Sequence, residues 1–131
     1  MKSTIEVDPS SRLVRLTLEG PGSVEDCVRL LGQMRDRPDI EPGFRTLVDI
    51  RRLQYAATLS ESRYLVEERE RGAKDFGPTA IVVGDDLHHG TSRQFAALSE
   101  LRGKTAAVFR DMVEAEVWLG VRKHGSAGEA G

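Results

Sequence analysis

The pattern of hydrophobic and polar residues divides the chain into short strands and amphipathic helices. Residues 4–7 and 12–19 alternate with a period of two, which is typical of strands that are buried on one face. The turn-forming segment Asp8–Ser11 lies between them, so the two strands are predicted to form an antiparallel hairpin. Three later runs are short and mostly apolar, as in strands buried on both faces: 46–50, 79–83 and 105–109.

Apolar residues three and four positions apart predict a helix after the hairpin and after each buried strand. The four helices are expected at about residues 23–36, 58–72, 87–101 and 111–119. Thr58 and Glu61 form a capping box at the start of the second helix, and the charged run 67–71 is interpreted as its solvated face. The third helix carries a long apolar stripe: Leu87, Thr91, Phe95, Leu98 and Leu101.

The order of the predicted elements is ββαβαβαβα, which indicates the α/β class. Each later strand–helix–strand unit favours parallel strands that are joined by right-handed crossovers. We therefore expect a mixed sheet of about five strands, with an N-terminal antiparallel hairpin followed by alternating βα units. Residues 1–120 are predicted to form one domain. Residues 121–131 lose the periodicity, gather Gly, Ser and Ala, and are expected to be a disordered tail.

Composition narrows the classes of function. The net charge of −2 gives no basic surface for nucleic acid. Cys27 is the single cysteine, so no internal disulfide forms, which is compatible with the reducing cytoplasm; its apolar helical position predicts a core residue. The N-terminus lacks the pattern of a signal peptide, and no apolar run approaches the roughly 20 residues of a membrane span.

Three segments, in this order and spacing, resemble the SpoIIAA-like family of the STAS superfamily, which is also grouped with CRAL-TRIO lipid-carrier domains. They are Leu47–Arg51, then Ala80–Val83 with His89–Phe95, and then Val108–Asp111 with Ala115, Trp118 and Leu119. The resemblance implies the fold of these small bacterial domains, whose biochemical role is largely undefined. Our own hypothesis adds a cytoplasmic protein that acts through contacts with a partner or with itself as a homodimer.

Thr58 occupies a position of special interest within this resemblance. In antagonist-type STAS domains, an Asp-Ser pair follows a strand that ends in Asp, and the serine at the helix N-terminus is phosphorylated. The corresponding pair here is Ala57-Thr58, counted from Asp49. The acidic partner is missing, and the capping role of Thr58 accounts for the residue without phosphorylation.

The ends of the three buried strands form the candidate site. The carboxyl ends of parallel strands meet at one edge of an open sheet, which is where such sheets bind ligands. We therefore predict a binding edge built from strand ends and the turns and helix starts that follow them: Asp49, Arg51, Thr58, Asp85, Asp86, His88, His89, Arg93 and Arg110.

Two interpretations of this edge remain open. Arg51, Arg93 and Arg110 could bind an anion, or they could pair with nearby aspartates. A metal site built from the Asp85-Asp86-Leu-His88-His89 segment is the sharpest alternative, but this is not an established ligand spacing. The simpler reading makes Asp85 or Asp86 a helix cap and the histidines a polar surface. We therefore expect neither a metal nor a cofactor.

The function that these patterns favour is non-enzymatic. Ser92 lacks the Gly-x-Ser-x-Gly elbow, and the turn at residues 84–90 lacks the features of a phosphate-binding loop, so no catalytic residue is predicted. The leading hypothesis is a STAS-like domain for protein–protein interaction or regulation in the bacterial cytoplasm. The alternative is a domain that binds a small molecule or a lipid in a pocket between the sheet and the helices. Its ligand would be apolar or anionic.

Overall fold

The computed structural model describes residues 1–71 and 75–121. Five strands and four helices follow one another within these residues, in the order that the sequence predicts. The strands are β1 (Lys2–Asp8), β2 (Leu13–Pro21), β3 (Arg45–Gln54), β4 (Thr79–Val82) and β5 (Ala106–Phe109). The helices are α1 (Val24–Asp36), α2 (Leu59–Glu70), α3 (Asp86–Glu100) and α4 (Met112–Leu119).

The five strands form one mixed sheet in the order β1-β2-β3-β4-β5. β1 pairs with β2 antiparallel, and the remaining neighbours are parallel. The predicted hairpin and the alternating βα units are therefore confirmed. β3 extends beyond the predicted residues 46–50, and its far end pairs with the end of β2 after a register shift between Thr17 and Glu19.

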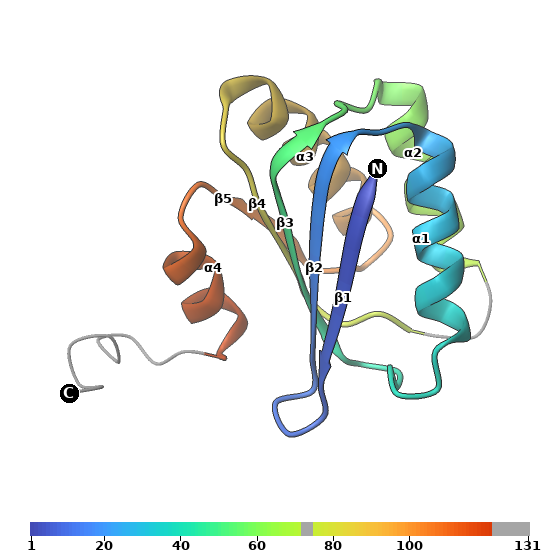
Figure 1. The fold of residues 1–131 in the computed structure, drawn as a ribbon, viewed down its shortest axis with the longest axis vertical. Coiled ribbons are helices and arrows are strands. Elements are labelled where there is room, and N and C mark those ends of the chain that lie inside the picture. The colour runs from blue at the N-terminus through green and yellow to red at the C-terminus, as the bar shows by residue number, and fades with distance from the viewer. Residues whose placement is uncertain (72–74, 122–131) are drawn as a thin grey trace.

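The helices cover the sheet unequally: α1, α2 and α3 lie on one face and α4 lies on the other (Figure 1). Two clusters of buried side chains fill these two layers. The first includes Leu16, Leu18, Leu30 and Met34 between the sheet and α1, and the second includes Leu13, Leu47, Ala115 and Leu119 beneath α4. The alternation of side chains along a strand explains the division, because neighbouring residues such as Leu47 and Val48 point to opposite faces.

All four helices begin at a residue whose side chain accepts a hydrogen bond from the first turn. These capping residues are Ser23, Thr58, Asp85 and Asp111. At α2 the capping box is complete, because the Glu61 side chain also accepts from the Thr58 N–H. Such caps satisfy backbone donors that the helix itself leaves free, so they fix where each helix starts.

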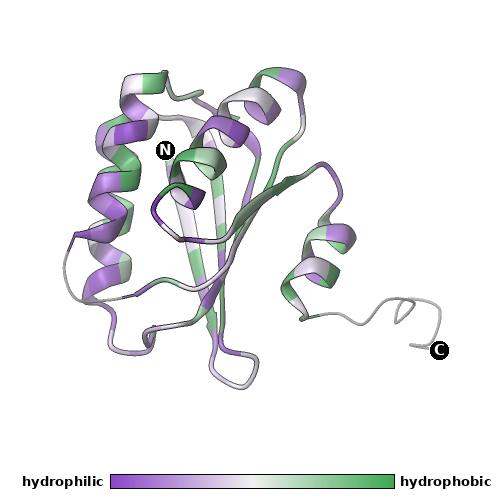
Figure 2. Ribbon diagram, turned by 180° about the vertical axis from the view of Figure 1, so that it is seen from behind, coloured by the Kyte–Doolittle hydropathy of each residue, from purple (hydrophilic) through white to green (hydrophobic). Residues whose placement is uncertain are grey.

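The buried face of α3 differs from the predicted stripe. Leu87 and Leu101 are 64% and 83% exposed, so their assignment to an apolar face against the core is wrong. The buried residues of this helix are instead His88, Ser92, Ala96 and Ser99. They are small or polar, which allows the helix to lie close to its neighbours and makes hydrophobicity a poor guide to the face. Figure 2 shows hydrophobic and hydrophilic residues intermixed along the helices.

The charged run at the end of α2 is also not a uniform solvated face. Glu68 and Arg69 are only 5% and 8% exposed, although Glu67 is exposed as predicted. Glu68 and Arg69 follow Leu65 by three and four positions, so they lie on the same face of α2 as this buried leucine. Packing of that face against the protein therefore buries both charged side chains. α2 ends at Glu70, and the predicted end at Gly72 lies outside the described residues.

The predicted tail, 121–131, lies outside the described residues except for Val121, which packs against the cluster beneath α4. Within the residues that the structure covers, no helix combines the length and the hydropathy needed to cross a membrane.

Candidate functional site

The carboxylate of Asp49, at the predicted strand-end edge, is paired within its own strand. Arg51 donates to it through Nε and Nη2, at 3.0 and 2.9 Å. Partial burial opposes ionisation of Asp49, but these hydrogen bonds lower the pKa of its carboxyl below the ordinary value. The Asp49–Arg51 pair thus supports the pairing interpretation of Arg51 over that of a free anion-binding group.

The next strand end carries two aspartates with separate partners. Asp85 caps α3 by accepting from the His88 N–H at 2.8 Å. Arg110, just after β5, donates to Asp86 at 2.6 Å. The hydrogen bond from the His88 backbone, followed by that from its side chain, lowers the pKa of Asp85. The exposed ion pair between Arg110 and Asp86 thus connects the segment after β5 with the segment after β4.

His88 is buried, so the prediction that it belongs to a polar surface is wrong. Its Nδ1 lies 2.9 Å from both carboxylate oxygens of Asp85, and its Nε2 lies 3.0 Å from the Tyr55 carbonyl oxygen. Both facing groups can only accept hydrogen bonds, because the carboxylate is ionised and a carbonyl has no proton. Each ring nitrogen of His88 therefore faces an acceptor, one on the capping residue Asp85 and one on the Tyr55 backbone. His88 thus ties the start of α3 to the segment between β3 and α2.

The remaining predicted residues lie apart from these pairs. His89 and Arg93 line a shallow groove with Ala96, Ala97 and Ala107, between α3 and the edge strand β5. Thr58 is exposed and engaged in its capping box. The described part of the chain contains no group of three or more His, Cys, Asp or Glu side chains that could hold a metal ion.

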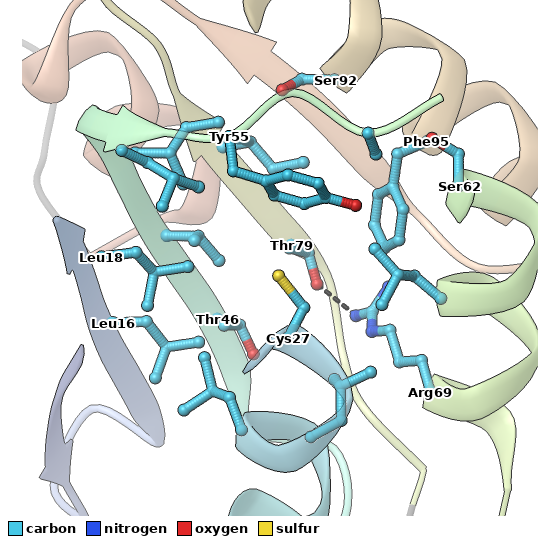
Figure 3. Close-up of a pocket in the computed structure, with 18 of the residues that line it drawn as sticks. Leu16, Leu18, Cys27, Thr46, Tyr55, Ser62, Arg69, Thr79, Ser92 and Phe95 are labelled. Carbon is cyan, nitrogen blue, oxygen red and sulfur yellow. Dashed lines mark hydrogen bonds between the residues drawn. The ribbon is translucent and has the colours of Figure 1, made fainter. Parts of the chain in front are cut away.

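A cavity lies beneath this edge, between the sheet and the helices α1, α2 and α3. Its volume is about 170 Å³. The sheet contributes side chains such as Leu16, Val48 and Ile81, and the helices contribute Leu30 and Phe95, among others. Figure 3 shows these side chains arranged around a common space, with Cys27 entering it from α1. The lining is mainly apolar, which is the usual character of a site for a small molecule.

Three polar atoms in the wall of this cavity are buried and make no hydrogen bond: Tyr55 Oη, Ser62 Oγ and Arg69 Nη1. Burial, followed by the negative charge of Glu61, raises the pKa of Tyr55. Glu61 thus influences the Tyr55 hydroxyl, although the two groups do not make a hydrogen bond of normal geometry. Buried polar groups in native proteins nearly always have partners, so three orphans around one cavity indicate a space suited to a ligand or water.

Cys27 also lines the cavity and is half-buried, so it faces the interior without being one of the fully buried core residues that its position predicted. Burial, followed by the charges of Asp26 and Glu61, raises the pKa of its thiol to about 11. A thiol with such a pKa carries almost no thiolate near neutral pH, and the thiolate is the reactive form. Cys27 is therefore part of the wall and not a nucleophile.

Sequence reasoning missed the cavity residues Ser62 and Arg69. Their spacing of seven places them on the same face of α2 as Leu65, and this spacing is a signal that could have drawn attention to them. It was masked because Arg69 stands within a run of charges that, considered alone, is typical of a solvent-facing helix.

The hairpin, the parallel βα units and the strand order form a SpoIIAA-like α/β fold. A solved structure of this kind matches the chain with a TM-score of 0.60 and 18% sequence identity, covering 90% of this chain and 92% of that one. It is an uncharacterized protein of the DUF3478 family, with a SpoIIAA-like fold, from Shewanella loihica PV-4. No family model matches the sequence, and no curated protein matches it.

Proposed function

We propose that this chain is a non-enzymatic STAS-type domain that binds a small, largely apolar molecule in the cavity between its sheet and α1–α3. The observation that carries the proposal is the apolar cavity with a few unpartnered polar atoms in its wall. Its 170 Å³ is close to the roughly 150 Å³ of an engineered cavity that admits benzene. It is smaller than the ~300–1,000 Å³ of most pockets for drug-sized ligands, which favours a small molecule over a long-chain lipid.

The hydrogen bonds of His88 support a role without catalysis. Asp85 and His88 together resemble the carboxylate–histidine half of a catalytic triad. However, Nε2 of His88 lies 3.0 Å from the Tyr55 carbonyl oxygen, so it is directed at the backbone and not at a nucleophile. Ser92, one turn further along α3, therefore lacks a general base in this arrangement.

Calorimetric titration with 1-octanol, a neutral apolar probe, tests the binding proposal. We expect saturable binding with a negative heat-capacity change, since apolar surface is removed from water. The variant Cys27→Phe places a ring in the cavity and should abolish the signal. Val28→Phe is the matched control, because Val28 is not part of the cavity wall and lines a separate surface groove with Val24 and Tyr64. This variant should bind octanol like the natural chain.

Two outcomes would contradict the binding proposal. One is the absence of octanol binding to the natural chain, and the other is equal binding by the Cys27→Phe variant. Native mass spectrometry of protein purified from its own host adds a second readout, because an apolar molecule bound in the cavity should be retained as a mass increment.

A specific observation also favours the second candidate, self-association or partner binding in the bacterial cytoplasm. Leu87 and Leu101, at the two ends of α3, are the most exposed of the large hydrophobic side chains that the structure describes. They are fourteen positions apart, so they lie on nearly the same side of the helix. We propose that this side of α3 contacts a second copy of the chain.

Sedimentation velocity tests this homodimer. The natural chain should sediment as a concentration-dependent dimer, and the double variant Leu87→Lys with Leu101→Lys should sediment as a monomer. Leu59→Lys, on the exposed side of α2, is the control and should remain dimeric. A natural chain that is monomeric at every concentration would exclude self-association and leave a different protein as the partner to be sought.

A further inference from the structure

Arg69 brings a positive charge into the apolar cavity. Its side chain extends from the last turn of α2 and is 8% exposed. Nη2 donates to Thr79 Oγ1 and weakly to the Gly77 carbonyl oxygen at 3.5 Å, and the guanidinium carbon lies 5.7 Å from the centre of the Phe76 ring. Figure 3 shows the guanidinium beside Thr79, at the wall of the space that Cys27 and Tyr55 also enter.

This guanidinium lacks the partner that a buried charge normally has. Nη1 makes no hydrogen bond. Within the described chain, Glu68 pairs with Arg71 and Glu70 pairs with Arg102, and no carboxylate lies within 4.0 Å of Arg69. Burial lowers the pKa of Arg69 to about 10, yet the group remains charged near neutral pH. A buried, unpaired charge destabilises the folded state, whereas a charge that is paired with a bound anion does not carry that full cost.

We infer that the cavity binds a small monocarboxylate with an apolar body, whose carboxylate accepts hydrogen bonds from Arg69. This inference rests on the proposed binding function and specifies its ligand class. The free Nη1–H supplies a charge-assisted hydrogen bond, which is stronger than one between neutral groups. The apolar body lies among the side chains of the sheet, α1 and α3. The hydroxyls of Ser62 and Tyr55, also without partners, accommodate a second polar group or a water molecule.

The basic side chains in the cavity wall favour a ligand that carries a single negative charge. Among the described residues that line the cavity, only Arg69 and His88 are basic, and both ring nitrogens of His88 already face acceptors on Asp85 and Tyr55. One guanidinium balances one carboxylate. A phosphate with close to two charges would leave negative charge uncompensated in an apolar space, which is costly.

Calorimetric titration with octanoate and 1-octanol tests this inference, because the two probes share a chain and differ in charge. The natural chain should bind octanoate at least about tenfold more tightly than octanol. Arg69→Met should lose that preference and keep octanol binding, because methionine retains apolar length in place of the charge. Arg71→Met is the matched control: Arg71 is two positions away, exposed and outside the cavity lining, so both affinities should stay as in the natural chain.

Each result decides between the proposals. Binding of octanol with no preference for octanoate overturns the monocarboxylate inference and leaves the apolar cavity site standing. Binding of neither probe overturns both proposals. Equal octanoate affinity in Arg69→Met and the natural chain shows that the anion binds elsewhere and overturns the role of Arg69. The fold of Arg69→Met is checked by thermal unfolding, and we expect no loss of Tm because the substitution removes an unpaired buried charge.

Discussion

Two buried basic side chains next to one cavity illustrate how hydrogen bonding separates a structural residue from a binding residue. His88 has acceptors at both ring nitrogens, and its contacts join α3 to the segment that carries Tyr55. Arg69 has an Nη1 that contacts no acceptor. The first arrangement is complete in the free protein, whereas the second is completed by a ligand. We therefore assign His88 to the framework of the cavity and Arg69 to ligand binding.

Replacement of His88 should destabilise the fold strongly. His88→Ala removes the ring contacts with the Asp85 carboxylate and the Tyr55 carbonyl oxygen, so we expect a loss of about 2–3 kcal/mol in the free energy of unfolding. Urea denaturation measures this loss. The control is His89→Ala, half-buried on the groove beside β5, which should change stability by less than about 0.5 kcal/mol. Similar losses in the two variants would contradict the account of His88.

The carboxylate of Asp85 should make stability depend on pH. Its pKa in the folded state is lower than the ordinary value, so its ionised form stabilises the fold above the unfolded-state pKa of about 3.9. That contribution is lost as the pH falls through the lowered pKa. Asp85→Asn retains a capping side chain but has no charge to lose. The Tm of the natural chain should therefore exceed that of the variant near neutral pH, and the gap should close in acid.

Asp86→Asn serves as the control for this measurement, because the Asp86 side chain is 95% exposed and its pair with Arg110 lies at the surface. Its Tm should follow that of the natural chain at every pH. A gap between Asp85→Asn and the natural chain that stays constant down to about pH 3 would refute the pH-dependent contribution of Asp85.

At the scale of elements, the periodicity of the sequence predicted the order of strands and helices, and its capping residues predicted the helix starts. The pairing of Asp49 with Arg51 was also among the predicted alternatives. The buried faces of α2 and α3 were not predicted. Ser92 and Ala96 are buried, whereas the larger and more hydrophobic Leu87 is exposed. Which face of a helix is buried thus depends on the shape of the neighbouring elements. The local pattern of apolar residues carries no information about that shape.

Gly77, in the segment that leads into β4, occupies a position that allows no side chain. A Cβ there would lie 2.5 Å from the Gly43 carbonyl oxygen and 2.9 Å from that of Phe44. Both atoms belong to the backbone, so neither can turn away. Gly77→Ala should therefore cost about 2–3 kcal/mol of stability in urea denaturation.

Gly90→Ala is the matched variant for this prediction. Gly90 lies in α3 with nothing within 4 Å of its Cβ position, so alanine should stabilise the helix by about 0.5–1 kcal/mol. The same substitution should thus have opposite signs at the two sites. Destabilisation by Gly90→Ala, or tolerance of Gly77→Ala, would contradict the packing described here.

At the scale of the whole molecule, the cavity arises where the sheet and three helices leave space between their side chains. The sequence suggested a pocket in this layer as an alternative, but it could not place Ser62 and Arg69 in the wall. Their burial depends on how α1 and α3 pack against α2. At the predicted strand-end edge, Asp49, Asp85 and Asp86 take part in ion pairs and a helix cap, and binding at this edge stays a prediction. Those pairs leave the cavity beneath them as the better-supported binding region.

A crystal structure of the protein grown with octanoate tests the central claim most directly. We predict octanoate inside the cavity, with a carboxylate oxygen about 2.7–2.9 Å from Arg69 Nη1 and with its chain near Ile81 and Phe95. A cavity that contains no octanoate at a concentration that saturates the protein in solution, or octanoate bound only on the outer surface, would contradict it.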